Sequence, residues 1–194
     1  MGFLSATAAK SISGGGNTGG YLTASKLSDG ESMRFAIISE EPLEYFTVWG
    51  ENSEGQKKPF RFVSEPSPSD IQAELGDFEQ RLNYEGSELE KPKFAISFFV
   101  FDHASETIKV LEVGQKGLMK ELDKLSQEEE YSDLGAWDMK ISRTGVKLNT
   151  EYRLMPIPRK KGSDEKIAAA KAAADEAGYD IQQLLVGNSP FGAA

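Results

Sequence analysis

Aromatic side chains that could stack on a planar ligand gather in one short stretch, FAISFFVFDH at 94–103. Because side chains alternate along a strand, Phe99, Phe101 and His103 share one face, and the other phenylalanines share the opposite, core-facing one. The first of these faces has two interpretations. Phe99 and Phe101 form a platform on which nucleobases stack, or they close a second small core beneath the acidic residues 64–92.

A second group of residues combines cations with an aromatic side chain at a strand end, which suits contacts with phosphates. The aromatic candidate is Trp49, beside Gly50, and the candidate cations are Lys57, Lys58, Arg61, Arg143, Lys147 and Arg153. Each phosphate contact would release counterions, so affinity would fall with salt. For any single lysine, simple solvation at the surface is the competing interpretation.

Catalytic and metal-binding chemistry finds little support. The chain has no cysteine, and its one histidine, His103, cannot build a multi-histidine metal site. The consecutive side chains of 128–130 point in different directions, which is typical of a solvated acidic loop. Asp102 and Asp138 are the only carboxylate pair that an enzyme could use. We therefore expect a binding protein that needs no cofactor and no metal.

Charge is distributed unevenly along the 194 residues, whose net charge is -9 and whose pI is near 4.8. Acidic residues dominate 64–90 and 121–133, whereas 140–161 are basic. No apolar run approaches the roughly 20 residues needed to span a bilayer, and the start lacks the pattern of a secretory leader. A cytoplasmic location without membrane contact is the natural expectation.

Hydrophobic periodicity predicts a mainly β chain with few helices. The strands are expected at 33–38, 43–50, 59–63, 93–102, 107–113, 136–143 and 151–157, and the helices at 71–82, 115–125 and 163–178. The acidic helix at 71–82 would be an insertion between strands.

The order of these elements favours a five-stranded OB-fold barrel, because one helix between its third and fourth strands fills the place where they part. The first barrel strand would come from 43–63, and a β-sandwich is the alternative. We expect a flexible arm at 1–31, the barrel at 32–161, and a C-terminal helix and tail at 162–194. The apolar end of that tail would dock on a partner or on its own barrel.

Two stretches between residues 92 and 158 resemble a known family. They are PKFAISFFVFDHASETIKVLEVGQKG and YSDLGAWDMKISRTGVKLNTEYRLMPIP. The resemblance is to the OB-fold single-stranded-DNA-binding proteins of tailed bacteriophages. In that family a Pro-Lys strand ends in Val, an aromatic residue and Asp. A Leu-Glu strand and Gln-Lys then precede a helix, and an aromatic-Asp strand leads to an Arg-Thr-Gly turn and a Tyr.

The resemblance implies that Phe101 lies on or beside the DNA-binding strand, and it places Tyr152 and Arg143 at matching positions. His103 stands where the family often has tyrosine, and the zinc-containing relatives are not matched because cysteine is absent. The implied function is sequence-independent coating of single-stranded DNA during phage replication, recombination or repair, in the cytoplasm of the infected cell. Phage replication or recombination proteins would bind the C-terminal tail. A phage structural or adaptor OB-fold module is the alternative.

Overall fold

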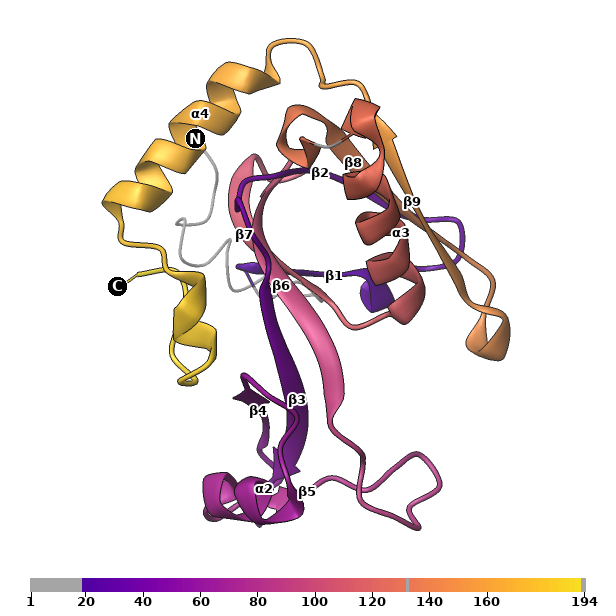
Figure 1. The fold of residues 1–194 in the computed structure, drawn as a ribbon, viewed down its shortest axis with the longest axis vertical. Coiled ribbons are helices and arrows are strands. Elements are labelled where there is room, and N and C mark those ends of the chain that lie inside the picture. The colour runs from indigo at the N-terminus through magenta and orange to yellow at the C-terminus, as the bar shows by residue number, and fades with distance from the viewer. Residues whose placement is uncertain (1–18, 132, 193–194) are drawn as a thin grey trace, which may run out of the picture.

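The computed structural model describes residues 19–131 and 133–192 (Figure 1). The described residues form nine strands, which are β1 (Tyr21–Thr23), β2 (Ser32–Ile37), β3 (Leu43–Glu51), β4 (Lys57–Phe62), β5 (Glu79–Gln80), β6 (Lys93–Asp102), β7 (Thr107–Val113), β8 (Asp138–Thr144) and β9 (Glu151–Ile157). The helices of this part are α2 (Pro68–Leu75), α3 (Lys116–Gln127) and α4 (Ser163–Glu176). Short 3-10 helices are η1 (Ala24–Lys26), η2 (Glu129–Tyr131), η3 (Leu134–Ala136), η4 (Lys147–Asn149) and η5 (Ile181–Leu184). The mainly β prediction is confirmed.

The strands form one mixed sheet in the order β1-β7-β6-β2-β8-β9. β3 branches from this path by pairing with β6, and β4 and β5 pair with β3. β1 runs parallel to β7, whereas the pairs between the following strands are antiparallel. Within the described residues no strand pair joins β1 to β9, so the sheet is curved but not closed. The predicted five-stranded OB-fold barrel is therefore not observed: the sheet does not close, because β1 occupies the edge of β7 that would face β9.

β6 is the central strand, and two different strands share one of its edges. β2 pairs with its C-terminal end and β3 with its N-terminal end. Residues 38–42 connect β2 to β3 without being part of a strand, and we call this interruption the break. Pro42 in this segment has no backbone N–H to donate to a strand partner. The amides of Ile38 and Ser39 still donate to Phe99 O, at 2.9 and 3.3 Å. The predicted first strand, drawn from 43–63, is thus incomplete, since β2 supplies its other half.

The main core lies on the inner face of the curved sheet. Phe98 and Val100 of β6 meet Met139 of β8 there, and Leu118 and Leu122 of α3 close the open side. The helix predicted at 115–125 is present as α3, and its buried leucines are four residues apart, as one face of a helix requires.

An arm formed by 46–92 extends away from this body, with β4, β5 and α2 at its far end (Figure 1). The acidic helix predicted at 71–82 is present but ends earlier, as α2, because Gly76 has a positive φ of 56° that stops the helix. Ser67 caps its start in a reciprocal pair with Asp70.

The described part of the predicted flexible arm, 19–31, is ordered into β1 and η1. Leu22 and Ala24 are buried in the main core, which explains why this glycine-flanked segment joins the sheet. The rest of that predicted arm lies outside the described residues.

The C-terminal segment, 163–191, packs on the outer face of β6 and β7. Ile167 and Ala174 of α4 contact Phe101, and Leu184 of η5 contacts Tyr45 and Val110 in a neighbouring cluster. The tail thus docks on its own sheet, one of the two predicted alternatives. Within the described residues, no helix has the length and apolar character needed to cross a bilayer.

Candidate nucleic-acid interface

Cations gather on the outer face of β2, β8 and β9. Met139, Ile141 and Leu154 point into the core, so the alternating residues between them point outward. Register places Arg34 opposite Lys140, and Ser142 opposite Arg153. The cations of these strands and of the segment that follows β9 form a surface that we call the basic face. It consists of Arg34, Lys140, Arg153, Arg159, Lys160 and Lys161.

A buried carboxylate organises one end of the basic face. Asp138 is 0% exposed, and Arg34 Nε donates to its Oδ2 at 2.8 Å. Arg159 Nε lies 3.0 Å from Oδ1, and the backbone amide of Lys160 donates to Oδ2 at 3.2 Å. His103 Nε2 also lies 3.0 Å from Oδ1. A buried charge needs such partners, and Asp138 in turn fixes the side chains of Arg34 and Arg159.

The basic face carries more positive charge than its acids neutralise. Arg34 and Arg159 share Asp138, and Arg159 also pairs with the exposed Asp164 at 3.4 Å, so the surplus positive charge lies on the other cations of this face. The Arg34 side chain remains 34% exposed. Lys140, Arg153 and Lys160 form no side-chain ion pair with any other residue of the described part. This face is therefore locally cationic on a chain of net charge -9.

The residues of the predicted aromatic platform lie elsewhere, beneath the C-terminal segment. Phe101 is 1% exposed and packs between Ile167 and Ala174 of α4. Phe99 is half-buried, with its ring centroid 5.8 Å from that of Tyr179. His103 lies edge-on to Phe101 at 5.3 Å. In this arrangement Phe101 is core and no base can stack on it, and the cover is α4 rather than the acidic insertion.

Among the predicted site residues of the arm, Arg61 has its partners within the fold. Arg61 lies over the Tyr45 ring at 5.3 Å, and its Nη2 is 3.3 Å from a Glu112 oxygen. The Tyr45 hydroxyl also donates to Glu112 at 2.7 Å, and burial together with this carboxylate raises the pKa of Tyr45 well above its usual range. Because its charge is balanced within the fold, Arg61 offers little to a phosphate.

The remaining predicted residues of the arm are more exposed. Trp49 is half-buried on the same face as Arg61, and Lys57 lies 3.6 Å from Glu51. Lys58 is on the opposite face, with its Nζ 5.0 Å from the centre of the Phe60 ring. The four predicted arm residues therefore do not form one continuous surface.

The β8–β9 hairpin separates its four predicted residues. Arg153 belongs to the basic face, whereas Arg143 Nη1 donates to the backbone oxygens of Ser25 and Leu27 and holds η1 against the sheet. Tyr152 is half-buried against the main core, and Lys147 is exposed near the hairpin tip. Arg143 and Tyr152 are thus structural in this arrangement, and Arg153 is the predicted cation that the basic face includes.

The carboxylate pair considered for catalysis is divided between the two faces of the sheet. Asp102 points inward and lies 2.8 Å from Lys109 Nζ. Burial alone would raise the pKa of Asp102, but hydrogen bonds from Lys109, Ser105 and the Ala104 amide lower it below its usual value. Among the described residues, no group of three His, Cys, Asp or Glu side chains could hold a metal ion.

Sequence reasoning missed Arg34 and the role of Asp138. Arg34 lies far from the basic run at 140–161 in the chain, and only the pairing of β2 with β8 brings it there. The usable signal was the alternation of Met33, Arg34 and Phe35, which places a cation on the outer face of a strand.

The chain matches no protein-family model, no curated protein and no solved structure. Its function is therefore inferred from the residues and their geometry.

Proposed function

We propose that this protein binds single-stranded DNA, largely without regard to sequence, and that the basic face holds the phosphates. The observation that carries the proposal is the cluster of cations on the basic face, on a chain that is otherwise acidic. Among the described residues, Lys140, Arg153 and Lys160 of this cluster have no ion-pair partner. Contacts to phosphates supply most sequence-independent affinity for nucleic acids. The resemblance to phage single-stranded-DNA-binding proteins agrees with this assignment and suggests a role in phage replication, recombination or repair.

The strand connectivity supports an open form of the OB-fold. β2 and β3 together take the place of the first strand, since they pair with β6, and β2 also pairs with β8. The later elements follow the OB-fold order: β6 and β7 correspond to its second and third strands, α3 to its helix, and β8 and β9 to its fourth and fifth strands. OB-folds of this partly open kind bind oligonucleotides.

On the proposed surface, neighbouring strands set the spacing of the cations at about 5 Å steps across the face. Met155 stands opposite Lys140 on β9 and is 39% exposed, so it offers an apolar contact to a base beside the cations. The carboxylate at this surface, Asp138, is buried and is occupied by its arginine partners. We therefore expect an oligonucleotide to stay intact during prolonged incubation with magnesium or manganese.

Fluorescence anisotropy of a labelled oligothymidylate, in a series of salt concentrations, tests the proposal. Binding should be detectable at about 50 mM salt and should weaken steeply as salt rises. Absence of binding at the lowest salt would overturn the proposal and would favour the protein-interaction module instead.

Paired substitutions locate the surface. Lys140→Gln with Arg153→Gln should reduce the salt slope by about 1.4, since each contact with a single strand contributes about 0.7. The matched control, Lys57→Gln with Lys58→Gln, removes the same charge from the arm. Equal losses in both double variants would show that net charge, rather than the basic face, determines affinity.

A further inference from the structure

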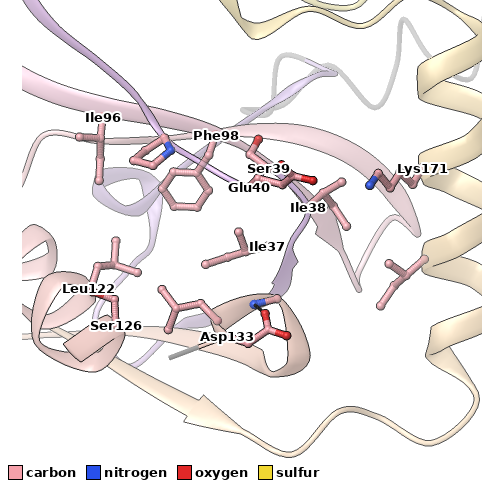
Figure 2. A pocket seen from close by; sticks show the side chains of 14 residues that line it. Ile37, Ile38, Ser39, Glu40, Ile96, Phe98, Leu122, Ser126, Asp133 and Lys171 are labelled. Atoms are coloured by element: carbon pink, nitrogen blue, oxygen red, sulfur yellow. Dashed lines mark hydrogen bonds between the residues drawn. The ribbon is translucent and has the colours of Figure 1, made fainter. Parts of the chain in front are cut away.

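A cavity of about 550 Å³ lies at the break between β2 and β3 (Figure 2). Pockets for small organic ligands commonly measure roughly 300–1,000 Å³. Its floor is apolar, because the break at 38–42 leaves the inner face of β6 uncovered there. The side chains of this floor are Ile37, Ile96, Phe98, Leu122 and Leu134.

The rim of the cavity is polar and comes from four separate segments. Glu40 lies in the break, Asp133 lies just before η3, Ser126 lies on α3, and Lys171 lies on α4. Figure 2 places Lys171 across the cavity from Ser126 and Leu122. Neither Glu40 nor Lys171 forms a side-chain hydrogen bond or ion pair with another described residue. Their polar groups thus remain for a ligand.

Asp133 is the rim acceptor whose carboxylate is oriented by a hydrogen bond within the fold. Its Oδ1 accepts a hydrogen bond from the Gly135 amide at 3.0 Å, as the cap of η3. This bond orients the carboxylate and leaves lone pairs on both oxygens. Gly135 also connects the cavity with the basic face, because its carbonyl accepts a hydrogen bond from Arg159 Nη2. Gly135 thus marks the point where the basic face and the cavity meet, and a strand that continues from the basic face past Arg159 would reach the cavity.

We propose that this cavity binds one nucleobase of the bound strand, and guanine in preference to the others; the inference rests on the proposed function. The apolar floor suits the faces of the ring, and a carboxylate can only accept hydrogen bonds. Guanine offers a ring N–H beside an exocyclic amino group, which matches the two oxygens of Asp133. Thymine offers one N–H between two carbonyl oxygens, which the carboxylate repels. Lys171 then faces an adjacent phosphate.

Oligothymidylates of about 12 nucleotides with a central dG, inosine or dT test this site. The strand with dG should bind about tenfold more tightly than the one with dT, since a bidentate contact discriminates bases by roughly that factor or more. Inosine lacks the exocyclic amino group and should give an intermediate affinity. Asp133→Asn should remove the difference, because an amide cannot accept at both positions, although its oxygen can still cap η3.

Asp123→Asn is the matched control, because Asp123 is exposed on α3 outside the cavity, and it should retain the preference for dG. Equal affinities for the three strands, with binding itself intact, would overturn the nucleobase site and leave the proposed function standing. A dG preference that survives Asp133→Asn would also overturn it. If no strand binds at low salt, both proposals fail.

Discussion

Two regions of the outer surface of the sheet differ in whether the chain itself covers them. Over β6 and β7, the C-terminal segment covers Phe99 and Phe101 of β6, and Ile108 and Val110 of β7. Over β2, β8 and β9, the surface carries cations and stays open.

Hydrophobic burial and desolvation explain the difference. Removing apolar surface from water stabilises the fold by about 25 cal/mol per Å², which favours a cover over aromatic side chains. Covering Lys140 or Arg153 would instead cost the desolvation of unpaired charges. An outward aromatic residue on a strand is therefore no sufficient sign of a ligand platform, because the chain itself can supply the partner.

The largest effect is expected from removing a ring on the covered region. Phe101→Ala should lower the free energy of unfolding by about 3–5 kcal/mol, because a buried ring is lost without a replacement. Urea unfolding measures this loss. Phe94→Ala is the control on the same strand, and since Phe94 is 38% exposed, its loss should be much smaller. Wild-type stability with weakened oligonucleotide binding would mean that Phe101 is a platform after all.

A somewhat smaller effect is expected on the open region. Asp138→Asn should lower the free energy of unfolding by about 3 kcal/mol, because it leaves the guanidinium groups of Arg34 and Arg159 without their buried partner. Asp164→Asn makes the same change at an exposed partner of Arg159 and should leave the urea midpoint nearly unchanged. If the two variants unfold alike, Asp138 does not organise the basic face.

Loosening the cover compares the two regions directly. Phe191 contacts the rings of Tyr21, Phe99 and Tyr179, so Phe191→Ala should lower the free energy of unfolding by about 2 kcal/mol. Oligonucleotide affinity, measured by anisotropy under conditions where the variant is folded, should stay within about twofold of wild type because Phe191 lies away from the basic face. A marked gain in affinity would instead indicate that the covered aromatic surface binds DNA.

The smallest effect concerns an exposed ion pair between the turn after β6 and α4. The pair consists of Glu106 and Lys166, and the hydrogen bond and charge of Lys166 lower the pKa of Glu106. The pair therefore stabilises the fold above the unfolded-state pKa of about 4.3, and this contribution is lost as pH falls through the folded-state value.

Glu106→Gln should barely change the thermal midpoint at neutral pH, and it should flatten the decline of that midpoint toward about pH 3.5. Identical pH profiles for the variant and the wild type would argue against a contribution from this pair to holding α4.

Much of the fold could be predicted from the sequence, because local patterns determine it. The hairpin of β6 and β7 was predicted with the observed bounds, since alternating apolar residues flank a turn. The closure of the sheet could not be predicted in this way. It depends on where β1 pairs, and a three-residue strand after a glycine-rich stretch has almost no periodicity to detect.

The candidate site was harder to predict, because it depends on contacts between distant segments. Arg153 could be identified from its place in a basic run, but Arg34 joins it only through strand pairing. A buried Phe101 and an exposed, base-stacking Phe101 would give the same alternation pattern in the sequence. Only the position of α4, which covers the ring, distinguishes the two. Arg143 is a cation like its neighbours, yet backbone carbonyls of η1 and its flanks occupy its guanidinium group.

Hydrogen–deuterium exchange of the whole protein, with and without a saturating oligothymidylate, most directly tests whether the open region is the DNA-binding surface. Exchange should slow in β8, β9 and 158–161, and it should not become faster in 163–191. Faster exchange in 163–191 on binding, with β8 and β9 unaffected, would contradict this account and assign the strand to the covered aromatic surface.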